Sequence, residues 1–214
     1  MEYQDIEESL NWRYAVKEYD PSKKLNTSQW ELLKKALQLA PSSYGLQPWK
    51  FIVVQNIQIR QKLREVSWGQ SAIEDCSHLV VFTALKEISS SHIQKHISQT
   101  AKVRGQDPSA LDGFKNFMEQ KILIEKPLDT HLEWNFRQAY IAMGFLLETA
   151  ALIKVDATPI EGLTPEKYNE ILKLTETPYS TVAAVTLGFR GQEDQYQFAE
   201  KSRFNESDVI EILT

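Results

Sequence analysis

Residues 139–153, AYIAMGFLLETAALI, form the most apolar stretch of the chain, and their pattern decides the fold. We expect them to form the later half of a helix that runs from about Leu128 to Lys154. Apolar residues lie nearly all round this half, so the sequence predicts a helix that is buried on every side. The stretch is too short to cross a bilayer and contains Glu148, which argues against a membrane span.

The segments on both sides of this helix supply the remaining elements. Further helices are predicted over about Gln4–Trp12, from a cap at Asn26 or Thr27 to a stop at Pro41, and from Thr164 with Pro165 at its first position. Strands are predicted near Phe51–Val54, Leu79–Phe82, Val155–Thr158 and Thr181–Leu187. The region Ser89–Lys126 is polar and helical in character, punctuated by Gly105, Pro108 and Gly113. Four strands mixed with helices, without strict alternation, predict an α+β fold with the buried helix against one sheet face.

Composition narrows the class of protein. A length of 214 residues suggests one domain over residues 1–214. The net charge of −5 argues against nucleic acid or an anionic membrane as the main partner. Cys76 is the only cysteine, so no intrachain disulfide can form, and we expect a buried, inert thiol. The charged N-terminal segment lacks the apolar run of a signal peptide, so a cytoplasmic enzyme or binding protein is expected.

Signatures of nucleotide and metal chemistry are weak. The glycines form neither G-x-G-x-x-G nor a phosphate loop, which argues against a dedicated Rossmann pocket. His92 and His96 lie four residues apart on a predicted helix, a spacing that can hold a metal. They have no glutamate between them and no second cluster, so a solvated helix face is the preferred interpretation and no metal site is predicted. No G-x-S-x-G surrounds any serine, so a hydrolase nucleophile is not indicated.

Three segments fit core packing poorly. Arg13–Lys17 places two cations four residues apart, Ser42–Trp49 is small and polar with a glycine, and Pro159–Gly162 follows a predicted strand. Taken alone, each is explained equally well as a surface turn or as an ordinary connection between elements.

Taken together and in this order, the segments resemble the nitroreductase family of FMN enzymes, in particular its oxygen-insensitive NAD(P)H nitroreductase and flavin reductase branch. The matching stretches are RYAVKEYD at residues 13–20, APSSYGLQPW at 40–49, ATPIEG at 157–162 and KSR at 201–203. The resemblance implies an α+β three-layer sandwich, with a central mixed, mostly antiparallel sheet flanked by helices. It also implies an intertwined homodimer with FMN at the subunit interface.

The resemblance further implies an activity and a set of roles. Hydride would pass from NAD(P)H through FMN to small electron acceptors such as nitroaromatics, quinones or flavins. Arg13 and Arg203 would hold the phosphate, with Lys201 nearby, because a planar guanidinium can bind two oxygens. Lys17 would lie near flavin N1 and O2, where a fixed cation stabilises the reduced anion. Backbone N–H groups of Glu161 and Gly162 would address N5 and O4.

The remaining implied contacts surround the ring. Gln70 and Gln138 would contact the ribityl chain and the pyrimidine edge. Ser42, Ser43 and Gly45 would reach the flavin of the partner subunit. Tyr44, Trp68 and Phe117 would line the open face where substrates stack. The implied cofactor site also includes Tyr14, Ala15, Pro41, Pro159 and Ile160.

The chain departs from the family pattern at four positions. Many relatives have serine where Ala15 stands and asparagine where Gly45 stands, and some have asparagine and lysine at the places of Gly69 and Ala72. One hydroxyl contact to phosphate is therefore missing, and Lys17 is left as the cation near O2. Three alternatives stay open: a dihydropteridine reductase-type activity in the same family, a non-redox flavin-binding or sensor protein, and a helical scaffold without cofactor.

Overall fold

A four-stranded sheet lies at the centre of the computed structural model, which describes residues 2–213. Its strands are β1 (Trp49–Val54), β2 (His78–Leu85), β3 (Asp156–Ile160) and β4 (Tyr179–Gly188), in the order β1-β2-β4-β3. All three neighbouring pairs run antiparallel. The predicted α+β class is confirmed.

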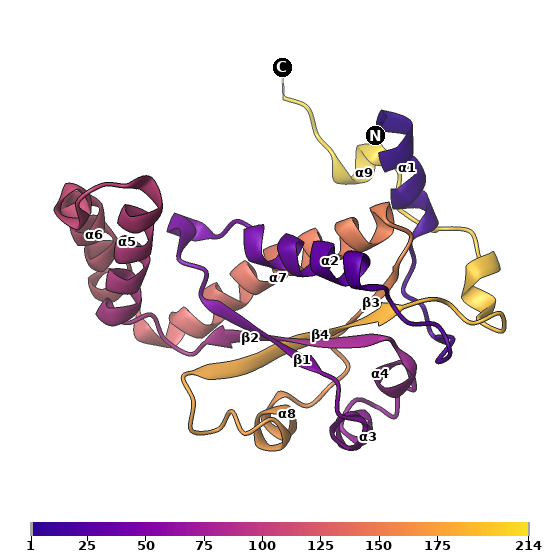
Figure 1. Ribbon diagram of the computed structural model, residues 1–214. Coiled ribbons are helices and arrows are strands. Elements are labelled where there is room, and N and C mark those ends of the chain that lie inside the picture. The colour runs from indigo at the N-terminus through magenta and orange to yellow at the C-terminus, as the bar shows by residue number, and fades with distance from the viewer. Residues whose placement is uncertain (1, 214) are drawn as a thin grey trace.

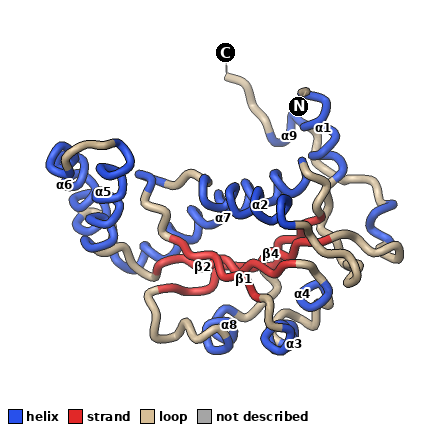
Figure 2. Tube along the Cα trace, in the orientation of Figure 1, coloured by secondary structure: helices blue, strands red, loops and turns tan. Residues whose placement is uncertain are grey.

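Helices cover both faces of the sheet (Figure 1). In the described residues the α-helices are α1 (Tyr3–Trp12), α2 (Thr27–Leu39), α3 (Ile57–Glu65), α4 (Ala72–Asp75), α5 (Ser90–Arg104), α6 (Asp112–Glu119), α7 (His131–Leu152), α8 (Pro165–Ile171) and α9 (Glu206–Val209). Figure 2 shows α2 and α7 on one face and α3, α4 and α8 on the other, with the strands between them. The predicted three-layer arrangement is therefore confirmed. None of the helices in residues 2–213 is long and apolar enough to cross a membrane.

Strand alternation divides the core between the two faces. Val80 and Phe82 of β2 belong to the apolar cluster under α2 and α7, whereas Leu79 and Val81 belong to the cluster under α3 and α8. Successive side chains of a strand point to opposite faces, so one buried strand supplies both layers.

The long helix differs from its prediction in one respect. The helix itself is confirmed over His131–Leu152, preceded by a 3₁₀ turn at Leu128–Thr130. The expectation that it is buried on every side is wrong for the single chain, because Tyr140, Ile141 and Phe145 are 39%, 41% and 46% exposed. These side chains form an apolar stripe along the face of α7 that turns away from the sheet.

Strand and helix boundaries bring further corrections. Pro159 and Ile160 were expected in a loop but lie within β3, where they pair with Val185 and Ala184 of β4. The helices α3 and α4 were not predicted. The predicted cap of α2 is confirmed, because the side chain of Asn26 accepts the N–H of Gln29.

Candidate functional site

A cavity of ≈ 460 Å³ joins the two ends of the chain. Its cations come from the segment after α1 and from the polar tail, two regions almost the full sequence apart. The lining includes Arg13, Tyr14, Ala15, Lys17, Tyr196, Lys201 and Arg203. The ammonium of Lys201 donates to the carbonyl of Arg13, so tail and N-terminal segment are in direct contact. The structure thus brings together the residues predicted from RYAVK and KSR.

An arginine clamp holds the N-terminal segment in place. The guanidinium of Arg190 lies 4.3 Å from the ring centre of Trp12 and 4.5 Å from that of Tyr14. Its Nε and Nη2 donate to the buried carboxylate of Asp156 at the start of β3. Because Trp12 and Tyr14 flank Arg13, this stack fixes the backbone from which Arg13 projects.

The next residues are fastened to the sheet. The hydroxyl of Thr158 in β3 donates to the carbonyl of Val16 at 2.8 Å. Tyr19 is buried and its hydroxyl donates to the carbonyl of Thr186 in β4 at 2.9 Å. Lys17, between these two anchors, is exposed, with its ammonium 6.0 Å from the ring centre of Tyr196. The sheet therefore sets the position of Lys17 through its neighbours.

In the part of the chain that the structure describes, the cations of the cavity form no direct ion pair, although Glu200 lines the cavity and Asp194 lies behind Lys17. Within residues 2–213 no carboxylate forms a salt bridge with Arg13, Lys17, Lys201 or Arg203. Burial and then the charge of Arg203 lower the pKa of Arg13, while Glu148 on α7 acts in the opposite direction. Burial and then the charges of Arg13 and Arg203 lower the pKa of Lys201. Cations that repel one another in this way are suited to a multivalent anion such as a phosphate dianion.

The turn after β3 forms a second part of the site. Gln70 donates from Nε2 to the carbonyls of Ser67 and Gly162, at 3.0 and 3.1 Å. Trp68 lies against Gly162 so closely that a Cβ at position 162 would be 2.6 Å from its Cε3. In this conformation of the exposed Trp68 ring, glycine leaves the room that a Cβ would take. The hydroxyl of Tyr140 on α7 donates to the carboxylate of Glu161.

The loop between α2 and β1 forms a third part. Gln138 on α7 accepts the N–H of Ser43 through Oε1 at 2.8 Å. Tyr44 has a φ of 56° and its ring meets that of Phe117 on α6 edge-on, with centres 6.1 Å apart. Trp68 lies elsewhere, against Gly162, so a single chain does not unite the three predicted substrate residues.

The histidine pair on α5 belongs to this third part. His92 shares a hydrogen bond of 2.7 Å between Nε2 and the carbonyl of Leu46. A Cβ at Gly45 would lie 3.2 Å from Cε1 of His96. The expectation of a solvated helix face is therefore wrong: both side chains pack against the loop. Among residues 2–213, no group of three or more His, Cys, Asp or Glu side chains could hold a metal ion.

Helix α7 shows how the three parts are arranged. The loop at Ser43 attaches to Gln138, whereas the turn at Glu161 attaches to Tyr140. Two residues along a helix correspond to a rotation of about 200°, and Gln138 is buried while Tyr140 is on the exposed stripe. In Figure 1 the loop between α2 and β1 and the segment after α1 lie at opposite ends of α2. One chain therefore holds the cations and the turn on one side and the Ser42–Gly45 loop on another.

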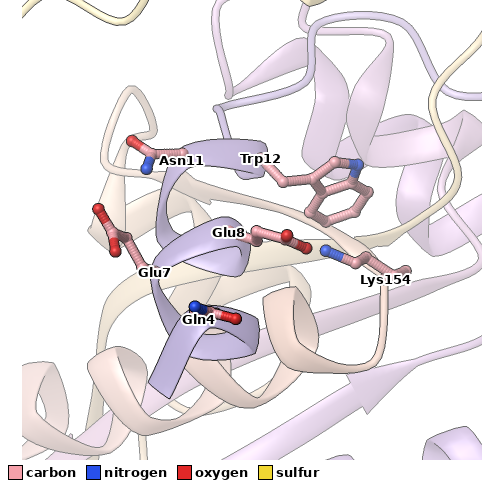
Figure 3. Close-up of a pocket in the computed structure, with 6 residues that line it drawn as sticks. All are labelled: Gln4, Glu7, Glu8, Asn11, Trp12 and Lys154. Atoms are coloured by element: carbon pink, nitrogen blue, oxygen red, sulfur yellow. The ribbon is translucent and has the colours of Figure 1, made fainter. Parts of the chain in front are cut away.

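A second cavity, of ≈ 550 Å³, adjoins α1. Figure 3 shows its lining, with the carboxylates of Glu7 and Glu8 on α1 and the ammonium of Lys154 pointing toward Glu8. Two carboxylates and one ammonium line this cavity, whereas four cations and one carboxylate, Glu200, line the first, so the cationic cavity is the better anion site.

Sequence reasoning missed the residues that support the cations. Asp156 and Arg190 form the clamp, and Asp194 is buried behind Lys17, where its carboxylate accepts the Lys17 N–H at 2.7 Å. Asp194 lies in a polar part of the sequence, where nothing indicates that its side chain is buried. Only Asp156 could have been found from the sequence: it lies at the start of a predicted apolar strand, and a carboxylate buried there requires a partner such as Arg190.

Comparisons with known proteins agree with this geometry. A model described as "Nitroreductase family" matches residues 10–189. A Staphylococcus epidermidis protein named "Putative NAD(P)H nitroreductase" is 33% identical over 97% of this chain and 96% of its own length.

Solved structures share the fold. The crystal structure of a Bacillus subtilis protein described as a "putative nitroreductase" superposes with a TM-score of 0.85 at 18% identity, covering 99% of this chain and 100% of that chain. An Exiguobacterium sibiricum protein with the same description, crystallised in complex with FMN, gives a TM-score of 0.82 at 17% identity. That match covers 100% of this chain and 98% of the other.

Proposed function

The chain belongs to the nitroreductase family, and from this premise we propose that it is an FMN-dependent enzyme that takes hydride from NAD(P)H and reduces small acceptors. The acceptor classes that we propose are nitroaromatics, quinones and flavins. The observation that supports this best is the cavity between the chain ends, in which Arg13, Lys17, Lys201 and Arg203 gather without a carboxylate partner among the described residues. An FMN-bound structure of the same fold adds indirect support.

The residues present fit FMN. Arg13, Lys201 and Arg203 would bind the phosphate, with the planar guanidinium groups each able to offer two parallel N–H donors. Gln70 and the backbone N–H groups of the Glu161–Gly162 turn would hold the ribityl chain and ring. Gln138, which accepts the Ser43 N–H, would contact the flavin of the second copy together with the Ser42–Gly45 loop. Bound FMN would supply the hydride transfer between nicotinamide and acceptor.

The protein's own contribution is binding, orientation and electrostatics. Lys17 would place a fixed cation where negative charge develops, and such a preorganised charge requires no rearrangement during the reaction. Tyr14, Ala15, Pro41, Pro159 and Ile160 would complete the cofactor site as backbone and packing neighbours. We assign no side chain as general acid or base.

We further propose that residues 1–214 form one FMN-binding domain that acts as a homodimer. The apolar stripe of Tyr140, Ile141 and Phe145 needs a cover in water. The tail beyond Ser202 is exposed throughout the described residues, with Phe204, Ile212 and Leu213 each at least 80% accessible. A second copy could also bring its Ser42–Gly45 loop to the side of α7 that holds Lys17 and Glu161.

The absorbance spectrum of the purified protein is the decisive experiment. We expect a yellow protein with about one FMN per chain that NADH or NADPH bleaches and that a quinone or nitroaromatic reoxidises. Bound flavin that NAD(P)H does not bleach would support the sensor alternative, and a colourless protein that does not take up FMN would support the scaffold. Faster reoxidation of the reduced flavin by a dihydropteridine than by quinones would support the dihydropteridine reductase-type activity within the family.

A further inference from the structure

Asp194 joins the two halves of the cationic cavity. One carboxylate oxygen, Oδ2, accepts the backbone N–H groups of Lys17 at 2.7 Å and Glu18 at 3.2 Å. The other, Oδ1, accepts the N–H of Tyr196 at 3.0 Å, at the start of the 3₁₀ turn Gln195–Phe198. The side chain is 1% exposed. Both oxygens are thus occupied by backbone donors from opposite ends of the chain.

These donors lead directly to the cations. Lys17 is four residues from Arg13, and the turn begun at Tyr196 leads in five residues to Lys201, whose ammonium returns to the carbonyl of Arg13. Asp194 is therefore hydrogen-bonded to the segment that carries Arg13 and Lys17, and the tail that follows Asp194 returns to Arg13 through Lys201. The tail makes few other contacts, since residues 198–213 are exposed.

We propose that Asp194 is a positioning residue that holds the Arg13–Lys17 segment and the Lys201–Arg203 segment around one phosphate group. The inference rests on the proposed binding of FMN in this cavity. Asp194 touches neither phosphate nor ring in this role. It acts through the backbone, where charge-assisted hydrogen bonds from three N–H groups fix two otherwise independent segments.

A positioning role and a purely electrostatic role of Asp194 predict opposite changes in the affinity for an anionic ligand, so the two can be told apart. Asp194 is an anion close to the cations, so simple electrostatics predicts that its neutralisation tightens the binding of an anionic ligand. A positioning role predicts that the same change weakens binding, because an amide cannot accept hydrogen bonds on both sides. The sign of the effect separates the two explanations.

The test compares FMN with riboflavin, which lacks the phosphate. Dissociation constants are measured by flavin fluorescence for the apo forms of wild type, Asp194→Asn and Asp194→Ser. Serine can still cap the turn at Tyr196 but cannot reach Lys17, so the second variant keeps the local turn while removing the connection. Glu193→Gln is the matched control, since it removes the same charge from an exposed neighbour.

The expected result is a loss of FMN affinity of about tenfold or more in both Asp194 variants. Riboflavin affinity should change much less, and Glu193→Gln should bind FMN as wild type or slightly more tightly. FMN affinity that is unchanged or increased in the Asp194 variants would overturn the proposal. Equal losses for FMN and riboflavin would also overturn it, because they would indicate general damage rather than a displaced phosphate site.

A readout without flavin separates this inference from the proposed function. If wild type binds no FMN, the proposed function fails, yet the fastening by Asp194 can still be measured. We expect faster hydrogen exchange at the amides of Lys17, Glu18 and Tyr196, and faster tryptic cleavage after Lys201, in Asp194→Ser. Unchanged exchange and cleavage in a folded variant would reject the positioning role on its own.

Discussion

Arg190 and Asp156 form a multiply hydrogen-bonded ion pair at the edge of the sheet. Nε and Nη2 of Arg190 donate to Oδ1 of Asp156 at 2.9 and 2.5 Å, and the Arg190 backbone N–H donates to Oδ2 at 2.7 Å. Asp156 is the first residue of β3, and Arg190 follows the neighbouring strand β4, with which β3 pairs. The pair thus closes the end of the two strands beside the cationic cavity.

Breaking this pair should destabilise the fold. Asp156→Asn leaves Arg190 without its anionic partner, and loss of one member of a buried pair costs about 3–5 kcal/mol. Because Arg190 is partly exposed, we expect the lower end of this range, about 3 kcal/mol, in the free energy of unfolding by urea. Glu170→Gln, which breaks the exposed pair with Lys167, should cost about 0–1 kcal/mol. If Asp156→Asn lowered the free energy of unfolding no more than this control does, the Arg190–Asp156 pair would not have the stabilising role assigned to it.

The fold was largely predictable because its signals are local. Pro41 ends α2, Pro165 begins α8, and the apolar run at Leu79–Phe82 lies inside β2. The extension of β3 to Ile160 was not predictable, since Pro159 suggests a loop and only pairing with β4 overrides it.

The site was predicted only in part, for a physical reason. The cations Arg13 and Lys201 were found by resemblance, but the residues that support them depend on contacts distant in sequence. Asp194 meets Lys17 across a separation of 177 residues. Arg60 is a similar case: it is buried and donates to the carbonyls of Val54, Cys76 and Ser77, contacts that no local pattern reveals.

Removal of the Lys17 charge should affect reduction more than binding. In Lys17→Ala the cations that we propose for the phosphate remain, so we expect FMN to bind while its reduction becomes less favourable by about 1–3 kcal/mol. The midpoint potential of the loaded variant measures this shift. Lys62→Ala, a change at an exposed position on α3, should leave the potential at the wild-type value. An unchanged potential in a folded, FMN-loaded Lys17→Ala protein would exclude this role.

A charge on the stripe of α7 should dissociate the proposed dimer. Phe145→Asp places a carboxylate in the apolar stripe, where an unpaired charge is costly to bury. Sedimentation velocity at about micromolar concentration should show wild type as a dimer and the variant as a monomer with weakened FMN binding. Ile57→Asp, an exposed apolar position on α3, is the control and should remain dimeric. A stable, FMN-loaded wild-type monomer would rule out the dimer.

Stability should fall on mild acidification, partly through His78. This ring stacks on Trp30 with centres 4.4 Å apart, and burial, then the charges of Arg60 and Lys24, lower its pKa. The unfolded chain gains a proton below about pH 6.5 while the folded chain does not. The contribution of His78 is therefore complete above that pH and is lost as the pH falls toward the folded pKa.

His78→Phe keeps a stacking ring and removes the proton. We expect the drop in Tm between about pH 7.5 and pH 5.5 to be smaller in this variant than in wild type. The difference between the two proteins at the higher pH measures the packing change together with the loss of the hydrogen bond between Ser77 and His78 Nδ1. Some drop should remain, because burial also lowers the pKa of His96. An equal drop in both proteins would show that His78 contributes nothing to the pH dependence.

The order of substrate binding should follow from a shared surface. The chain has no dinucleotide fingerprint, so NAD(P)H is expected to have no separate pocket and to stack on the open side of the site. In the proposed dimer the acceptor would need the same side, between Trp68 of one copy and the Tyr44–Phe117 pair of the other. Two flat molecules cannot occupy one face together, so NAD(P)⁺ should leave before the acceptor enters.

Initial rates at several fixed concentrations of each substrate test this order. We expect parallel double-reciprocal lines, as in a ping-pong mechanism, with flat dicoumarol-like aromatics competing directly with substrate for the open face. Tyr44→Ala, which removes one ring of the pair with Phe117, should raise KM for the acceptor more than it lowers kcat, since stacking contributes mainly to binding. Separate pockets would instead allow a ternary complex and give intersecting lines with a quinone or nitroaromatic. That outcome would reject the shared surface while leaving the assignment of the cationic cavity intact, because the phosphate contacts proposed for Arg13 and Arg203 do not depend on which molecule stacks first.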